Sequence, residues 1–295
     1  MNNLKSVGVE LFSCPESLTF DHDKFQLEQL EFIDTKKEKV FSGVGLYANP
    51  SSFHHPEVRR IRLSAYKRMF PIFQKLWPGY HLEIIFNCFC TLYKNTSNNY
   101  EPWHRETKHS DVAHDDVIYD GWINLDPLGS PPQPFSCLPG TNSSYHIGNR
   151  YYFDCDDRRQ FSKEKIVYLV EPGHMLVYDR SIIKETWGRC STFDSHRLYL
   201  SYRLTRFKSP LYSKHQILTD QSVPPIFGAF KFDKQQPVMW EHRFMRFWKD
   251  QLLDFLSNLR PECNRQVMPS LKEAGLPLFP PYTPEEIEAY YPRKL

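Results

Sequence analysis

Hydrophobic and polar residues first follow a helical pattern in HHPEVRRIRLSAYKRMF (54–70). The apolar positions recur at the spacing of one helix face: Val58, Ile61, Ala65 and Met69. Pro56 suits the first turn of a helix, and we expect Pro71 to end it. The other face is basic: Arg59, Arg60, Arg62, Lys67 and Arg68. This combination predicts an amphipathic helix with a solvated basic face, in preference to a nucleic-acid-binding patch.

From residue 81 onward the pattern changes to short runs of branched and aromatic residues, which are typical of strands. These runs are HLEIIFNCFCTLY (81–93), VIYDGWINLD (117–126), KIVYLV (165–170), HMLVYD (174–179) and HRLYLSYRLT (196–205). Turn-rich links such as PLGSPPQP and LPGTNSS separate them. Strands joined by irregular loops favour an antiparallel sandwich or jelly roll over an alternating βαβ sheet.

The run 196–205 also predicts what each of its two faces contacts. One face carries Arg197, Tyr199, Ser201 and Arg203, and the other carries Leu198, Leu200, Tyr202 and Leu204. We expect the polar face to point into the interior of a barrel and the apolar face to pack against covering helices.

We interpret residues 1–295 as a single domain of three regions. Residues 1–80 form an N-terminal loop and helical region, 81–207 a β core, and 208–295 a C-terminal helical extension with a Pro-rich tail. Within the extension, VMWEHRFMRFWKDQLLDFLSNL (238–259) has an apolar stripe that predicts a core-packing helix. The segment PLFPPYTPEE is expected to run extended over the surface.

The composition of the chain argues against several classes of partner and binding site. The net charge of +2 implies neither a nucleic acid nor an anionic membrane as partner. No apolar run approaches the about 20 residues that span a bilayer, and the first residues lack the apolar core of a secretory signal. The 7 cysteines contain no C-x-x-C pair, so we expect reduced thiols, a cytoplasmic protein and no zinc ribbon.

The stretch EPWHRETKHSDVAHDD (101–116) is the densest cluster of metal-binding residue types in the chain. Non-haem Fe(II) oxygenases hold their metal with two His and one carboxylate, which leaves positions open for co-substrate and O₂. Residues i and i+2 of a strand point the same way, so His104 and Glu106 can supply two ligands from one strand end. A second such pair is His109 and Asp111. With His114, that pair would instead form a metal site of hydrolase type, or belong to a polar loop without a metal.

Five segments in this order resemble landmarks of the phytanoyl-CoA dioxygenase family: EPWHRE, YDGWINLDP, FSCLPGTNSSYH, EPGHMLVYDRSIIK and SHRLYLSYRL. In that family a W-H-x-D motif precedes a strand ending in an L-D turn, a PGSH turn, a strand from PGD to a distal metal His, and an Arg-bearing strand. The resemblance covers roughly residues 80–205. It implies a mainly β fold with flanking helices (α+β), a double-stranded β-helix (jelly-roll) core, and Fe(II) and 2-oxoglutarate as cofactors.

The resemblance also assigns roles to individual residues. His104 and Glu106 match the His-x-carboxylate metal pair, with Glu in place of the commoner Asp. Arg197 matches the residue that holds the distal carboxylate of 2-oxoglutarate, a role that suits a planar guanidinium. Arg203 is the alternative for that role. Asn124 is a candidate contact to 2-oxoglutarate, or else a hydrogen-bonded strand residue.

One position departs from the family pattern. Where relatives carry the distal metal His, this chain has Lys184, 13 residues before Arg197. A protonated Lys has no lone pair and cannot bind Fe(II). We therefore expect the Lys184 ammonium to take the place of the metal and to pair with Glu106. Glu185 could serve as a third ligand only after a register shift, and the other nearby imidazoles, His174 and His196, fit structural roles better.

Three functional hypotheses remain from the sequence. The first is an Fe(II)/2-oxoglutarate-dependent hydroxylase that uses His104, Glu106 and some third ligand. The second is a catalytically silent member of the same fold, kept as a binding or structural protein, of the divergent kind that resembles relatives encoded by large DNA viruses. The third is a metallohydrolase centred on His109, Asp111 and His114. Lys184 favours the second hypothesis, whereas the His104–Glu106 pair and Arg197 favour the first.

Overall fold

The computed structural model describes residues 3–13, 20–21, 53–92, 101–105, 116–142, 153, 155–186, 195–208, 218–221, 231–232, 237–238, 271–272 and 278–295. Apart from its first residue, the helix predicted over 238–259 lies outside these ranges. The helices are α1 (Asn3–Ser6), α4 (Pro56–Leu76), α5 (Cys155–Glu164) and α9 (Pro284–Ala289). The first strands are β1 (Val9–Ser13), β2 (His81–Leu92), β3 (Glu101–His104), β4 (Asp116–Asn124), β5 (Gln133–Leu138) and β6 (Ile166–Val170). The later strands are β7 (His174–Asp179), β8 (Ile183–Thr186), β9 (Ser195–Thr205), β10 (Lys231–Phe232), β11 (Pro237–Val238) and β12 (Arg293–Lys294).

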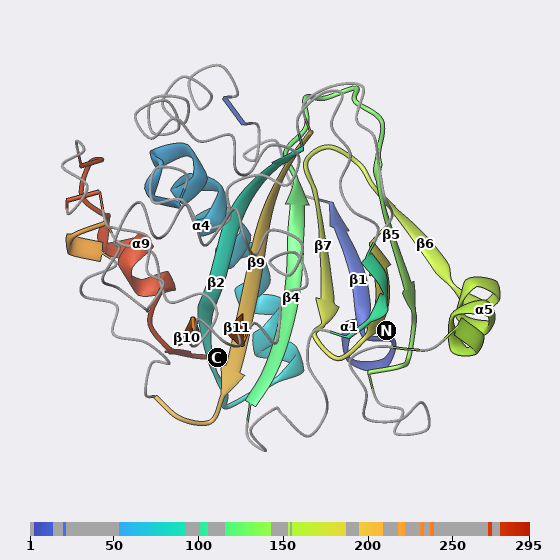
Figure 1. Cartoon of the computed structure of the whole chain (residues 1–295). Coiled ribbons are helices and arrows are strands. Elements are labelled where there is room, and N and C mark those ends of the chain that lie inside the picture. Colours follow the sequence, from blue (N-terminus) through green and yellow to red (C-terminus); the bar gives the residue numbers. More distant parts are fainter. Residues whose placement is uncertain are drawn as a thin grey trace.

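Two larger antiparallel sheets dominate the molecule (Figure 1). One has six strands in the order β1-β7-β4-β9-β2-β12, and the other has four in the order β3-β8-β5-β6. From β2 to β9 the strands pair as a nested set: β2 with β9, β3 with β8, β4 with β7, and β5 with β6. The prediction of a mainly antiparallel β fold with flanking helices is therefore confirmed. Within the described ranges, no helix is long and apolar enough to cross a membrane.

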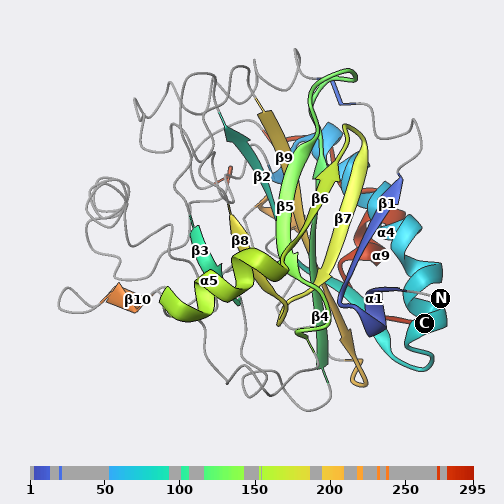
Figure 2. The same ribbon diagram turned by 90° about the vertical axis from the view of Figure 1, so that its right-hand side faces the viewer.

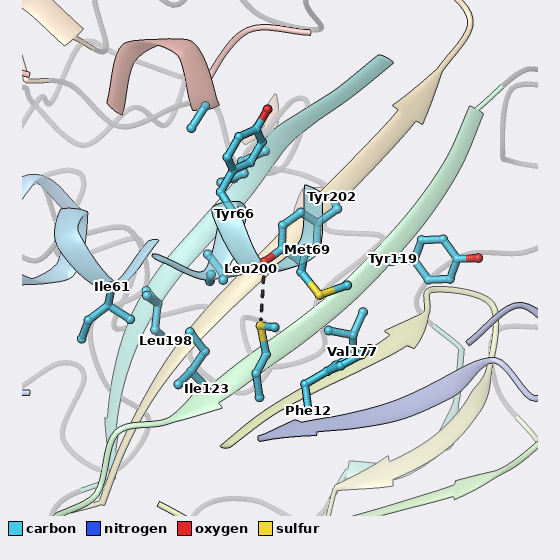
Figure 3. Packing of buried hydrophobic residues seen from close by; sticks show 14 of the residues in the cluster. Phe12, Ile61, Tyr66, Met69, Tyr119, Ile123, Val177, Leu198, Leu200 and Tyr202 are labelled. Carbon is cyan, nitrogen blue, oxygen red and sulfur yellow. Dashed lines mark hydrogen bonds between the residues drawn. The ribbon is translucent and has the colours of Figure 1, made fainter. Parts of the chain in front are cut away.

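The main core lies between α4 and the six-stranded sheet, and Figure 3 shows part of it at close range. Phe73 of α4 is fully buried, and its ring centroid lies 5.3 Å from that of Tyr119 and 5.4 Å from that of Tyr202. The whole apolar face of β9 belongs to this core: Leu198, Leu200, Tyr202 and Leu204. The prediction that this face packs against a covering helix is confirmed.

The helix α4 corrects two expectations. It continues through Pro71 to Leu76, because Pro71 is exposed while Phe73 extends the buried stripe of the helix. The expectation that Pro71 ends the helix was therefore wrong. The basic face is also not wholly solvated, since Arg59 and Arg62 are only 4% and 2% exposed.

Those two arginines bind the C-terminal segment, whose helix α9 lies beside α4 in Figure 1. Arg59 forms an ion pair with Glu286 at 2.5 Å and lies 3.8 Å over the ring of Tyr282. Arg62 donates hydrogen bonds to the hydroxyl of Tyr290 and to the carbonyl of Phe53. The tail therefore packs on the helix and ends in β12, which extends the sheet beside β2. Local periodicity could not reveal this, because the partners lie more than 200 residues apart in the chain.

Several elements were not expected from the sequence, among them β1, β5, β8 and α5. The segment PLFPPYTPEE, expected to run extended, enters the helix α9 at Pro284. β5 begins within a stretch that looked like a turn-rich link and carries Pro134, which is unfavourable in strands. β8 has only four residues, and it is held on both sides by pairing with β3 and β5. Tertiary pairing thus overrides weak local preference in both strands.

Candidate functional site

A row of three buried side chains crosses the four-stranded sheet. His104 on β3 lies opposite Lys184 on β8, and Lys184 lies opposite Cys137 on β5. Directly opposed residues in an antiparallel sheet share a face. Their exposed fractions are 3%, 6% and 0%. The fold therefore brings an imidazole, a lysine and a thiol together from three distant segments of the chain.

This row faces the space between the two sheets. The Lys184 Nζ atom lies 5.3 Å from the ring centroid of Tyr178, which belongs to the six-stranded sheet. Cys137, Tyr178 and Trp122 belong to one apolar cluster. Burial raises the pKa of the Cys137 thiol to about 12, against the opposing effect of the nearby Lys184 charge. The row thus lies in a desolvated, aromatic environment.

The opposite face of β8 packs against a second cluster of aromatic side chains. Ile183 packs with Trp103, Phe153 and Phe161, the last of which comes from α5. Glu185 lies on this face too, because side chains alternate along a strand, and its Oε1 atom is 2.9 Å from the Lys165 Nζ atom. Glu185 therefore points away from the row of His104 and does not offer the third metal ligand considered from the sequence.

Arg197 lies on the facing strand β9, opposite Asn124 of β4. Its guanidinium carbon is 4.0 Å from the ring centroid of Trp122. Its Nε atom donates to the side-chain oxygen of Gln133, and its Nη1 atom donates to the Tyr199 hydroxyl at 3.2 Å. Because Trp122 and Tyr178 share one cluster, Arg197 and Lys184 both pack against the same aromatic interior.

Gln133 is the centre of a buried polar network beside Arg197. It is fully buried, and its Nε2 atom lies 2.9 Å from Asn124 Oδ1, 2.6 Å from Asp126 Oδ2 and 2.9 Å from Ser195 Oγ. The sequence offered no signal for this role, since a glutamine after a turn is usually exposed. Gln133 thus links Arg197 to three other strand and turn residues.

The same network includes hydrogen bonds at the end of β4 and in the turn that follows it. Asn124 donates to the carbonyl of Val170 at 2.8 Å, so its amide already bonds to the protein backbone. Asp126 accepts from the backbone N–H of His196 at 2.6 Å. Burial raises the pKa of Asp126 above its ordinary value, although these hydrogen bonds and Arg197 oppose the shift. These hydrogen bonds therefore hold the turn after β4 in place beside Arg197.

Arg203, the alternative carboxylate anchor, is bound elsewhere. It lies at the other end of β9, where its Nε atom is 2.7 Å from Asp116 Oδ2 and its Nη1 atom is 2.6 Å from Glu83 Oε1. Burial lowers the pKa of Arg203, but the two carboxylates outweigh that effect and leave it raised. A ligand carboxylate at Arg203 would have to compete with two acidic side chains of the protein.

The other predicted metal ligands fall in a part of the chain that the structure does not describe. Glu106, His109, Asp111 and His114 all lie outside the described residues. Among the residues that are described, no three His, Cys, Asp or Glu side chains form a group that could hold a metal ion.

The residues of the row can still be compared with the ligands that an Fe(II) triad requires. Iron of this type needs two imidazoles and a carboxylate around one point. The cross-strand neighbour of His104 is Lys184, whose ammonium has only donors. On the face of β8 that His104 shares, the residue opposite His104 is thus a cation and not an imidazole or a carboxylate. The residues of this row do not fit the iron triad.

Comparison with known proteins gives only distant likenesses. No protein-family model and no curated protein sequence matches the chain. Among solved structures it is similar to SnoK, a non-heme alpha ketoglutarate dependent carbocyclase from nogalamycin biosynthesis, with 11% identity, a TM-score of 0.45, and coverage of 68% of this chain and 81% of that one. EctD from S. alaskensis with 2-oxoglutarate and 5-hydroxyectoine shows 12% identity and a TM-score of 0.44, over 68% of this chain and 73% of that one.

A third likeness is EvdO2 from Micromonospora carbonacea var. aurantiaca, complexed with 2-oxoglutarate. It shows 14% identity and a TM-score of 0.40, over 69% of this chain and 88% of that one. All three TM-scores are below 0.5, so the roles of residues follow from the contacts of this chain alone.

Proposed function

We propose that the strands from β2 to β9 form a double-stranded β-helix, the jelly-roll core that the resemblance to the phytanoyl-CoA dioxygenase family implies. The nested pairing of first with last strand, second with second-to-last, and so on inward supports this proposal. A long hairpin folded across itself into two sheets produces such an order, with the interior between the sheets.

On this core the chain is a phytanoyl-CoA dioxygenase-like protein with an incomplete metal triad, and it binds a carboxylate ligand without acting as an iron oxygenase. The observation that carries the proposal is the cross-strand pair of His104 and Lys184. Lys184 supplies a positive charge where the family holds a metal, and Glu106 is the carboxylate that would compensate it.

Arg197 is the second element of this proposed binding function. A guanidinium held over an aromatic ring and hydrogen-bonded through Nε keeps a fixed orientation, which suits recognition of a carboxylate. A dicarboxylate such as 2-oxoglutarate has two groups that can interact with Arg197 and Lys184. Lys184 is almost fully buried beside the ring of Tyr178, and this low-polarity environment would strengthen its interaction with the ligand compared with water.

Anaerobic titration with Fe(II) and 2-oxoglutarate tests the metal part of the proposal. We expect the wild-type protein to show no metal-to-ligand charge-transfer band, and Lys184→His to gain metal binding. Lys163→His, on the exposed surface of α5, is the matched control and should gain none. A band in the wild-type protein, with hydroxylation of a substrate, would instead establish the active hydroxylase that uses His104 and Glu106.

Calorimetric titration with 2-oxoglutarate alone tests the binding part. We expect binding without metal and a loss of about tenfold or more for Arg197→Lys, since a lysine cannot form the bidentate contact. Arg206→Lys, on the exposed end beyond β9, is the control and should bind as the wild-type protein does. Equal affinity of wild-type protein and Arg197→Lys would refute the role of Arg197.

A further inference from the structure

The outer strand of the four-stranded sheet is unusually apolar on its surface. β6 pairs with β5 on one side, and no strand within the described ranges pairs with its other edge. β6 lies outside β5 at the right of Figure 1, the side that faces the viewer in Figure 2. Ile166, Val167 and Leu169 are 49%, 43% and 54% exposed. Two of these, Val167 and Leu169, lie on the outer face of the sheet, because Tyr168 and Val170 pack against the interior cluster.

Such an edge normally carries features that prevent pairing with another chain. Natural edge strands use prolines, bulges or charged side chains along the strand for this purpose. β6 has the sequence IVYLV, and its pairing with β5 is regular from Ile166 to Val170. The charges stand only at its two ends, with Lys165 before the strand and Glu171 after it.

We propose that β6 is a homodimer interface, in which the β6 strands of two copies pair antiparallel about a two-fold axis at Tyr168. In this register Val167 of one copy lies opposite Leu169 of the other, on the same outer face. The two four-stranded sheets would join into one continuous sheet of eight strands. Each exposed apolar residue of the outer face thereby gains an apolar cross-strand neighbour.

The charges at the strand ends explain why a second copy fits this edge. The same register places Lys165 of one copy beside Glu171 of the other, and the symmetry repeats this pair at both ends of the interface. Lys165 already contacts Glu185 of its own chain, but an ammonium has three donors and can contact both carboxylates. Shifting the register by one residue would place Val167 and Leu169 of opposite copies on different faces.

Sedimentation velocity across a dilution series tests the proposal on the full chain. We expect a monomer–dimer equilibrium for the wild-type protein. Leu169→Lys should weaken the dimer by about tenfold or more, because it puts a charge in the apolar cross-strand pair. Leu128→Lys is the control: Leu128 is 79% exposed on the turn after β4 and is not part of β6, so the dimer should be unchanged. Thermal unfolding of both variants establishes that they are folded.

Cysteine cross-linking tests the register independently. A mixture of Val167→Cys and Leu169→Cys proteins should form a disulfide between the two variants under oxidant. Each variant alone should cross-link no more than the wild-type protein, which carries the native cysteines. The proposal would be overturned if the wild-type protein stayed monomeric at every concentration, or if Leu169→Lys left the dimer intact. Disulfides that formed in another register would also overturn it. Pairing of the edge with an extended peptide of a different protein, without self-association, would also overturn it.

Discussion

His104 on β3 and Lys184 on β8 lie directly opposite each other across an antiparallel strand pair, although 79 positions separate them in the sequence. Both side chains are almost fully buried. The pairing puts a cation next to the imidazole that the family resemblance assigns to a metal. A buried charge needs a compensating partner, and this requirement makes the pair testable without any ligand.

The first prediction concerns that compensation. The proposed function pairs Lys184 with Glu106, so we expect Lys184→Met and Glu106→Gln each to lower the free energy of unfolding by about 3 kcal/mol, because each would leave the other charge without its partner. The double variant should lose clearly less than the two single losses combined. Chemical denaturation of the four proteins gives the coupling energy. Additive losses would show that Lys184 and Glu106 do not interact.

A second prediction concerns Gln133, which links Arg197 to the polar network. Gln133→Leu should lower the free energy of unfolding by about 1–3 kcal/mol, because it leaves buried polar groups without their hydrogen bonds. It should also weaken binding of 2-oxoglutarate, since Arg197 loses the acceptor of its Nε hydrogen bond. Gln160→Leu, on an exposed position of α5, is the matched control. Urea denaturation measures the stability, and an unaltered value for Gln133→Leu would contradict the structural role of the network.

A third prediction follows from the ion pair of Arg59 and Glu286. Burial alone would raise the pKa of Glu286, but the hydrogen bonds from Arg59 and Thr283 outweigh it and leave the pKa below its ordinary value of 4.5. The pair therefore stabilises the fold fully above about pH 4.5, and this contribution is lost as the pH falls through the lowered pKa.

Glu286→Gln isolates this effect, because Gln can still complete the capping box with Thr283 but carries no charge. We expect the variant to lose stability near neutral pH and to show a smaller further loss in acid. The measurement is the free energy of unfolding as a function of pH. The control is Glu288→Gln, whose side chain is 63% exposed. The same acid dependence in Glu286→Gln and wild-type protein would contradict the prediction.

A fourth prediction concerns Gly121 in the middle of β4. A Cβ atom there would lie 2.4 Å from the backbone oxygen of Leu176 on β7, and backbone cannot move aside as a flexible side chain can. Gly121→Ala should therefore lower the free energy of unfolding by about 1–3 kcal/mol through overpacking. Leu128→Ala in the turn after β4 is the control, since the side chain of Leu128 is 79% exposed. If thermal unfolding finds Gly121→Ala as stable as the wild-type protein, then β4 and β7 accommodate the added methyl group without loss of stability, against the prediction.

Sequence patterns predicted the strands rich in branched and aromatic residues and missed the strands with weak local preference. Branched and aromatic residues occur in each of the runs that form β2, β4, β6, β7 and β9. Their preference for strands can be recognised from the local sequence. β5 and β8 have weak local preference and exist because neighbouring strands supply their hydrogen bonds. The buried arginines Arg59 and Arg62 were predicted as solvated for a similar reason, because the segment that covers them follows more than 200 residues later.

The amino-acid sequence by itself determined the residue types at the site and the two faces of β9, and through the family resemblance it predicted that Lys184 stands where relatives carry a histidine. Those features depend on chemistry and on a period of two, which are local. The tertiary structure alone decided that Lys184 lies beside His104 and Cys137, that Glu185 faces away, and that Gln133 bonds to Arg197. The reason is physical: such contacts depend on the order and register of strands distant in the chain, and local periodicity carries no information about either.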